Sequence, residues 1–127
     1  MSKQVIQTNS APAPIGPYNQ AIRAGNMLFI SGQVAINPAT GEVEATDVAG
    51  EAHQVMKNLK AILTEAGMSF EQVVKTTIFL SDMSLFAGVN EIYAQYLEGT
   101  SYPARETVAV KGLPKNVNVE ISMIAVQ

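Results

Sequence analysis

Stretches rich in β-branched and aromatic residues recur along the chain, and in several of them apolar and polar side chains alternate. This pattern is typical of strands, which place successive side chains on opposite faces of a sheet. The dipeptide Gly25-Asn26 predicts a tight hairpin between two of these stretches. We expect strands over residues 3–8, 21–24, 27–34, 73–80, 104–110 and 117–126.

Two other stretches repeat their apolar residues every three to four positions, which predicts amphipathic helices. The first helix should begin near Thr46 or Asp47, either of which can cap it, and end before Gly67. The second helix should follow Asp82 or Ser84. Each helix carries one apolar stripe that must be buried.

The order of elements is strands, helix, strand, helix, strands, which indicates an α+β fold. Two amphipathic helices that share one sheet bury their stripes together only if they lie on the same face. We therefore expect one domain over residues 1–127, a mixed sheet of about six strands with two helices packed on one face. The strands also carry apolar residues toward the other face, so a neighbouring subunit is expected to cover it.

The composition excludes several kinds of chemistry. The 127 residues include no cysteine, which excludes disulfides, thiol nucleophiles and cysteine-based metal sites. The single histidine, His53, is expected to be a solvated helix residue, and the carboxylates show no spacing typical of metal ligands. Ser31 has no evident histidine partner for a catalytic triad, and no glycine-rich phosphate loop is present.

The charge and hydropathy of the chain indicate which partners and which location to expect. The net charge is −3, from 8 basic and 11 acidic residues, which argues against a nucleic-acid-binding protein. Charged residues make up only 15% of the chain, where about a quarter is typical, so an oligomer interface is expected to hide apolar surface. No apolar run approaches the ~20 residues of a membrane span, and the first residues lack the core of a signal peptide, so we expect a cytoplasmic protein.

Polar residues on otherwise apolar elements are the best candidates for a site. Arg105 and Glu120 are expected on neighbouring strands of a hairpin, where they can form a structural ion pair, stay solvated, or hold a small anionic ligand. Asn90 touches the apolar stripe of its helix and can cap a loop or face a pocket. Gly32, after Ser31, indicates either a bulge or the close approach of a ligand or backbone.

Several motifs occur together in one order. The C-terminal stretch YPARETVAVKGLP (residues 102–114) is followed by Val119-Glu120-Ile121, and further motifs are APIGPY (13–18), ISGQ (30–33), KTTIF (75–79) and VNEIY (89–93). Over essentially the whole chain, this set resembles the RidA/YjgF family of reactive-intermediate deaminases, also called 2-iminobutanoate/2-iminopropanoate deaminases.

The resemblance implies a chorismate-mutase-like subunit and a homotrimer with sites at the subunit interfaces. It implies hydrolysis of reactive 2-imino acids to 2-oxo acids and ammonia, without a metal or an organic cofactor. Arg105 would bind the substrate carboxylate, Glu120 would position the attacking water, and Tyr18 would close the pocket or bond to the substrate. The remaining substrate-binding positions implied are Ser31, Gly32, Asn90 and Thr107.

This chain departs from the common family pattern at Glu106, Thr107 and Ala109, where many members have a small residue, a cysteine and often a glutamate. Thr107 keeps a small polar side chain, so we expect activity to survive. The alternatives are a non-catalytic sensor or regulator that binds small carboxylates, a ribonuclease or translation inhibitor, and a chaperone-like role. Glu120 favours the enzyme over the sensor because binding an anion gains nothing from a nearby carboxylate, and the acidic balance disfavours RNA.

Overall fold

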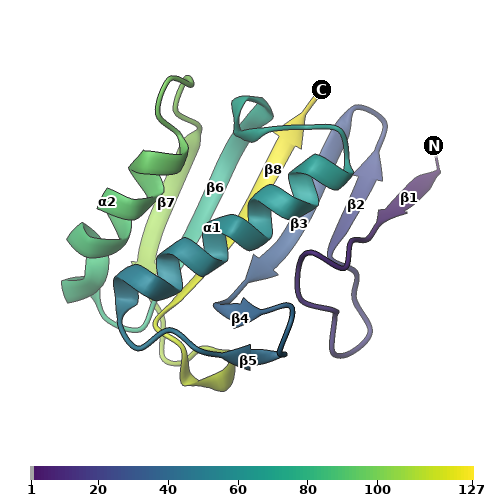
Figure 1. Cartoon of the computed structure of the whole chain (residues 1–127). Coiled ribbons are helices and arrows are strands. Elements are labelled where there is room, and N and C mark those ends of the chain that lie inside the picture. The colour runs from purple at the N-terminus through teal and green to yellow at the C-terminus, as the bar shows by residue number, and fades with distance from the viewer. Residues whose placement is uncertain (1) are drawn as a thin grey trace.

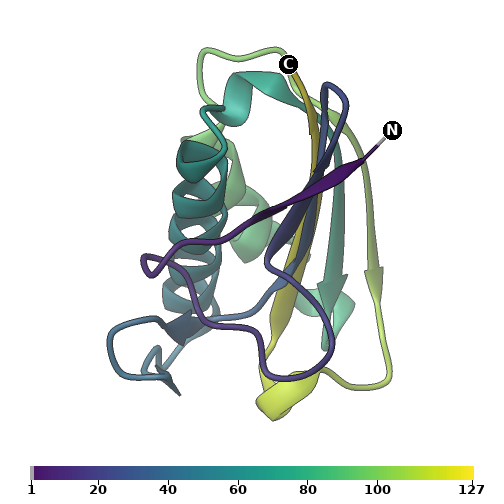
Figure 2. The same cartoon turned by 90° about the vertical axis from the view of Figure 1, so that its right-hand side faces the viewer.

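A computed structural model describes residues 2–127, in which a six-stranded sheet carries both long helices on one face (Figures 1 and 2). The helices are α1 (Val48–Glu65) and α2 (Phe86–Tyr96). In spatial order, the strands of the sheet are β1 (Lys3–Ile6), β2 (Ala21–Ala24), β3 (Met27–Gln33), β8 (Val119–Val126), β6 (Val73–Leu80) and β7 (Ala104–Ala109). A separate short hairpin consists of β4 (Ile36–Asn37) and β5 (Glu42–Val43). The expected mixed α+β architecture is confirmed.

The hydrophobic core lies between the helices and the sheet. In α1, residues at helical spacing such as Val55, Leu59 and Ile62 are fully buried. In β8, every second residue from Val119 to Ala125 is buried against the helices. Because burying one large apolar side chain contributes roughly 1.5–3 kcal/mol, this layer is the main source of stability. Within residues 2–127, no helix combines the length and apolar character needed to cross a membrane.

Helix α1 begins and ends as the sequence predicts. The Asp47 carboxylate accepts a hydrogen bond from the Gly50 N–H at 2.8 Å. Gly67, just beyond the helix, has a φ of 74°, a conformation that glycine adopts without strain. Arg23 donates to the carbonyl of Ala66, so one of the two arginines of the chain stabilises the end of α1.

The second helix begins later than expected. Asp82 accepts a hydrogen bond from the Ser84 N–H at 2.8 Å, but it caps a short 3-10 helix (Met83–Leu85) rather than α2. Helix α2 then starts at Phe86 and buries Val89, Ile92 and Tyr93.

The predicted hairpin between the last two strands is wrong. Strand β8 pairs antiparallel with both β3 and β6, whereas β7 pairs only with β6, in parallel, at the edge of the sheet. The chain reaches β7 from β6 through α2, because parallel strands require such a crossover. The reason is burial: β8 presents a continuous row of buried residues to the helices, whereas most of β7 is exposed.

This topology places Arg105 and Glu120 on opposite faces of the sheet. Arg105 is the ladder partner of Thr76, which is fully buried on the helix side. Glu120 is the ladder partner of Phe79, which points to the other side. Within one chain, the two side chains therefore form neither the ion pair nor the shared pocket that a hairpin would allow.

The sheet face turned away from the helices is open and partly apolar, as the sequence leads us to expect. Val5, Ile22, Phe29 and Ile124 are successive cross-strand partners in a row over β1, β2, β3 and β8. Phe29 is 42% exposed, and Val108 on β7 is 45% exposed. This apolar row has no cover within residues 2–127 (Figure 2).

Several polar side chains of α1 are buried or half-buried. His53 is half-buried rather than solvated, and its Nδ1 lies 3.0 Å from the hydroxyl of Tyr96. Asn58 is fully buried on the apolar stripe, and its Nδ2 donates to the carbonyls of Val34 and Ile36 at 3.2 and 3.0 Å. Asn58 thereby fixes α1 to the segment that leaves β3.

We predict that the substitution Asn58→Leu destabilises the protein by about 2–4 kcal/mol, because it leaves two carbonyls without their donor in the core. Urea denaturation at one fixed protein concentration measures this free energy of unfolding. Lys57→Ala, an exposed change on the same helix, should alter it by less than about 0.5 kcal/mol. An Asn58→Leu variant as stable as the unchanged protein would contradict this role.

Candidate functional site

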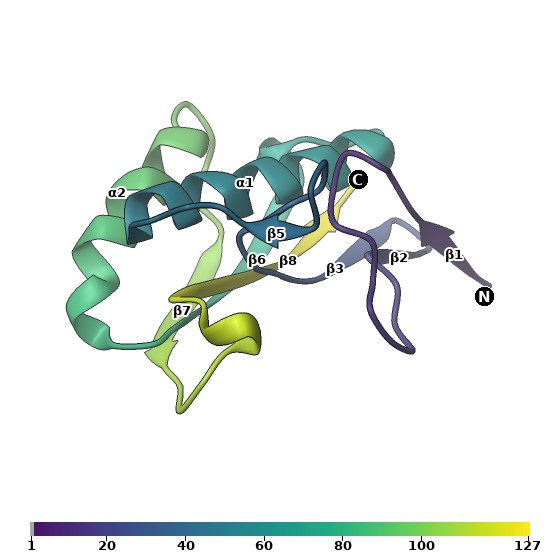
Figure 3. The same ribbon diagram turned by 60° about the horizontal axis from the view of Figure 1, so that its bottom comes forward.

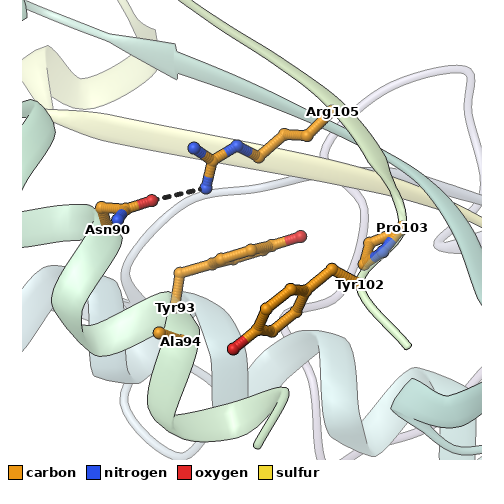
Figure 4. Close-up of a pocket in the computed structure, with 6 residues that line it drawn as sticks. All are labelled: Asn90, Tyr93, Ala94, Tyr102, Pro103 and Arg105. Atoms are coloured by element: carbon orange, nitrogen blue, oxygen red, sulfur yellow. Dashed lines mark hydrogen bonds between the residues drawn. The ribbon is translucent and has the colours of Figure 1, made fainter. Parts of the chain in front are cut away.

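The candidate residues gather in two clusters, each lining its own cavity. The arginine cluster lines a cavity of about 410 Å³ beside α2 and β7 and consists of Asn90, Tyr93, Ala94, Tyr102, Pro103 and Arg105 (Figure 4). The glutamate cluster lines a cavity of about 590 Å³ where β3 ends and β8 begins, and it contains Tyr18, Ser31, Gly32 and Glu120. Because Arg105 and Glu120 lie on opposite faces of the sheet, one chain keeps the two cavities apart.

One amide and two aromatic rings hold Arg105 in the arginine cluster. Its Nη1 donates to Asn90 Oδ1 at 2.7 Å (Figure 4). The central guanidinium carbon lies 5.1 Å from the ring centroid of Tyr93 and 5.6 Å from that of Phe86, which are cation–π distances. No further hydrogen bond joins the guanidinium to any of residues 2–127. Its other donors are therefore available for two-pronged binding of a carboxylate.

Helix α2 brings the partners of Arg105 to one side. Asn90 and Tyr93 are three residues apart and project from the same face of the helix. The hydroxyl of Tyr93 donates to Thr76 Oγ1 at 2.9 Å, which anchors the ring against β6. Burial raises the pKa of Tyr93, although this hydrogen bond and the charge of Arg105 act in the opposite direction. The ring is thus a fixed, neutral support for the guanidinium.

Thr107 lies two residues after Arg105 on β7 and so faces the same side of the sheet. Its hydroxyl oxygen is the one buried side-chain nitrogen or oxygen without a hydrogen-bond partner in the described part of the chain. A buried polar group left unpaired is unfavourable by about 1–3 kcal/mol. Thr107 does not line the cavity of the arginine cluster, so only a ligand that extends past Arg105 along β7 would reach this hydroxyl and remove the penalty.

In the glutamate cluster, Glu120 packs directly on the backbone of Gly32. A Cβ atom at position 32 would lie 2.8 Å from both Cδ and Oε2 of Glu120, which is closer than nonbonded atoms approach. The ladder between β3 and β8 also shifts register between Ile30 and Gln33. Gly32 therefore marks both an irregularity in the strand and a close approach, here of a carboxylate side chain.

Ser31 and Tyr18 form part of the wall of the same cavity. The hydroxyl of Ser31 donates to the carbonyl of Asn19 at 2.6 Å, so it ties β3 to the preceding loop. Tyr18 is 50% exposed, and its hydroxyl accepts a hydrogen bond from the Ile15 N–H at 3.2 Å. The hydroxyl proton of Tyr18 thus remains available to a ligand.

The carboxyl of Glu120 is desolvated without a compensating cation. Burial raises its pKa above the usual value for a glutamate. Within residues 2–127, the one ion pair with an N–O distance below 4.0 Å joins Lys75 to Glu106, at 3.2 Å. A carboxylate with a raised pKa is a better proton acceptor, so Glu120 is suited to general-base chemistry.

Tyr93, Tyr102 and Pro103 also line the cavity of the arginine cluster, although the sequence alone does not single them out. Tyr93 lies less than one helical turn from Asn90, and the other two directly precede the strand of Arg105, so proximity along the chain was the available signal. As for a metal, residues 2–127 bring no three histidine, aspartate or glutamate side chains close enough to hold one.

Comparison with known proteins shows which proteins this chain is similar to along its length. The family model described as Endoribonuclease L-PSP matches residues 8–127. The chain is 49% identical over 125 residues to the 2-iminobutanoate/2-iminopropanoate deaminase of Mus musculus, a match that covers 98% of this chain and 92% of that protein. Several relatives of comparable identity carry only the name RutC family protein.

Two solved structures share the fold along their full lengths. The Rid family protein YyfA from Yersinia pestis is 47% identical, with a TM-score of 0.97 and coverage of 99% of this chain and 100% of that chain. TdcF from E. coli, solved with bound serine, is 43% identical, with a TM-score of 0.94 and coverage of 98% of both chains.

We predict that Glu120 and Glu106 titrate on opposite sides of the ordinary glutamate value of 4.5. Burial raises the pKa of Glu120, whereas hydrogen bonds from Thr77 and Lys75 lower the pKa of Glu106. Carbon-13 shifts of the two side-chain carboxyls, followed against pH, measure both midpoints. Equal midpoints, or the reverse order, would refute the electrostatics described here.

The same shift has a consequence for stability. The folded state holds the proton of Glu120 more tightly than the unfolded chain, because its folded-state pKa is raised. The resulting contribution of Glu120 to the free energy of unfolding is fully present below the unfolded pKa and is lost as the pH rises through the folded pKa. Glu120→Gln should remove this part of the pH dependence of unfolding.

Proposed function

Because the chain belongs to the Endoribonuclease L-PSP family, to which the Rid and YjgF proteins belong, we propose that it hydrolyses 2-imino acids. The substrates proposed are 2-iminobutanoate and 2-iminopropanoate, and the products are 2-oxobutanoate or pyruvate with ammonia. The observation that carries the proposal is the pair of unsatisfied groups, a guanidinium with free donors and a desolvated carboxylate. The name of the mouse relative supports the same reaction.

The proposed active site lies between two copies of the chain. Arg105 and Glu120 face away from each other across the sheet of one copy, so a substrate can contact both only if they come from different copies. We propose a cyclic homotrimer, in which the arginine cluster of each copy lies against the glutamate cluster of the next. The exposed apolar row on the open sheet face, which includes Phe29, supports such an assembly.

In this site, binding and chemistry fall to different residues. Arg105 holds the substrate carboxylate with two parallel hydrogen bonds, and the unpaired hydroxyl of Thr107 donates beside it. Asn90 keeps the guanidinium oriented. The imine carbon is thereby presented to the glutamate cluster of the neighbouring copy.

Hydrolysis then needs one proton acceptor and one water. The substrate reacts as the protonated imine. Glu120 accepts a proton from the water as the water oxygen bonds to the imine carbon, and the carbon–nitrogen π pair moves to nitrogen, which gives a neutral amino alcohol. Glu120 then returns this proton to the nitrogen. The carbon–nitrogen bond breaks, ammonia leaves, and the hydroxyl becomes the carbonyl of the 2-oxo acid by giving its proton to Glu120, which releases it to solvent. Tyr18 and the backbone of Gly32 border the space in which the water sits. A protonated imine carbon is already electrophilic, so the proposed step uses neither a metal nor an organic cofactor.

Two other functions have less support. A non-catalytic sensor of carboxylates would need Arg105 and Thr107, but a nearby Glu120 would repel its ligand. The family description names RNA cleavage. The net charge of −3 disfavours RNA binding, because RNA is an anion. The one histidine, His53, is half-buried and contacts the Tyr96 hydroxyl, so it is poorly placed to act on RNA.

We predict that Arg105→Ala and Glu120→Gln impair different steps. Loss of the charge-assisted bonds of Arg105 should raise KM by about 10–100-fold. Loss of the proton acceptor at Glu120 should lower kcat by about 10²–10⁴-fold while 2-oxobutanoate still binds. A coupled assay in which a threonine dehydratase supplies the imine measures turnover, and calorimetry with 2-oxobutanoate measures binding.

Glu65→Gln, an exposed change of the same type at the end of α1, is the matched control and should leave both readouts unchanged. An unchanged protein that binds 2-oxobutanoate but does not accelerate imine hydrolysis would favour the sensor. Full activity of Arg105→Ala would overturn the role given to Arg105.

A further inference from the structure

Gln20 is one of the most buried polar residues of the chain, with 2% of its surface exposed. Its side-chain amide makes four hydrogen-bond contacts with one stretch of backbone. The two N–H groups of Nε2 donate to the carbonyls of Thr8, Ala11 and Pro12 at 3.0, 3.2 and 2.8 Å, one N–H being shared between two of them, and Oε1 accepts from the Thr8 N–H at 2.8 Å. The amide of Gln20 thus bonds to backbone groups of residues 8–12, which do not pair with a neighbouring strand.

The stretch concerned is the loop between β1 and β2, residues 7–20, which Figure 3 shows as a long excursion from the sheet. Its three prolines, which are Pro12, Pro14 and Pro17, have no N–H to donate. The described loop residues make little backbone pairing among themselves, apart from the bond from the Tyr18 N–H to the Gly16 carbonyl. The side chain of Gln20 is therefore the principal tie that fixes the path of this loop.

This loop delivers Tyr18 to the glutamate cluster. Two residues after Tyr18, the carbonyl of Gln20 accepts a hydrogen bond from the Ser31 N–H at 2.9 Å. The hydroxyl of Ser31 in turn donates to the carbonyl of Asn19 at 2.6 Å. Gln20 thus holds the loop with its side chain and joins β3, beside Gly32, with its main chain.

We propose that Gln20 is a positioning residue for the glutamate cluster, which acts by holding the loop so that Tyr18 faces Glu120. The inference rests on the proposed function only in its kinetic consequence, because the ordering of the loop can be measured without turnover. Gln20 itself does not line the cavity. Its effect on the reaction must therefore pass through Tyr18 and its loop.

The substitution Gln20→Leu removes all four hydrogen bonds at similar volume, whereas Gln20→Glu keeps the acceptor for the Thr8 N–H and loses the donors to the three carbonyls. We expect Gln20→Leu to lower kcat/KM for imine hydrolysis by about 10–100-fold at 25 °C, the effect of losing one or two net hydrogen bonds. The matched control is Gln95→Leu, since Gln95 is exposed on α2 and contributes to neither cluster.

A double-mutant cycle separates positioning from general destabilisation. Gln20→Leu, Tyr18→Phe and the combined variant are compared by kcat and KM at a temperature where thermal denaturation shows each to be folded. If Gln20 acts through Tyr18, the second change should add little to the first, because residues in one network are not additive. Independent losses that multiply would overturn the proposal.

Amide hydrogen exchange of residues 9–18, followed by mass spectrometry, provides the readout that does not depend on activity. Gln20→Leu should speed exchange at least tenfold in this loop and leave α1 unchanged. Gln20→Glu should speed it at least as much, because it sets a buried carboxylate against three carbonyl oxygens. An unchanged exchange rate in the loop would overturn the inference even if the protein hydrolyses imines. Faster exchange in a protein without imine hydrolysis would uphold the loop role and refute the proposed function instead.

Discussion

The position of β8 between β3 and β6 is the constraint on which the rest of the structure depends. Its buried residues, which include Val119 and Ile121, close the core beneath α1, and they do so only from the centre of the sheet. With β8 in that place, β7 must pair in parallel with β6 at the edge. Arg105 then points to the helices, and Glu120 points to the open face. The separation of the two clusters thus follows from how the core is filled.

In or beside each cluster, a single chain leaves polar or charged groups without a full set of hydrogen-bond or ion-pair partners. The guanidinium of Arg105 uses one donor on Asn90, the hydroxyl of Thr107 has no partner in the described chain, and Glu120 is desolvated without a cation. Folded proteins generally pair such groups, so exceptions that cluster indicate a site that a ligand or a second copy completes. Rigid supports surround them, namely the anchored ring of Tyr93 and the loop tied by Gln20.

The sequence is informative where local chemistry decides the outcome. Periodicity and capping located α1 and its Asp47 cap, and the hairpin at Gly25-Asn26 formed as expected. The strand order was not accessible in this way, because period two places a residue on a face but does not choose the neighbouring strand. For the same reason, Arg105 and Glu120 were expected together although topology separates them. The sequence does not reveal the roles of Asn58 and Gln20, because their side chains bond to backbone carbonyls that are distant along the chain.

Mixing the two impaired variants tests the central claim, a site shared between copies, most directly. Arg105→Ala and Glu120→Gln chains are unfolded together, refolded in equal amounts and assayed for imine hydrolysis beside unchanged protein treated in the same way. Random assembly brings an intact Arg105 against an intact Glu120 in about a quarter of the sites between copies. At substrate concentrations well below KM, the account predicts recovery of about a quarter of the unchanged activity, whereas Arg105→Ala alone keeps about a tenth to a hundredth and Glu120→Gln alone about a hundredth or less. A mixture no more active than the two variants apart would contradict it.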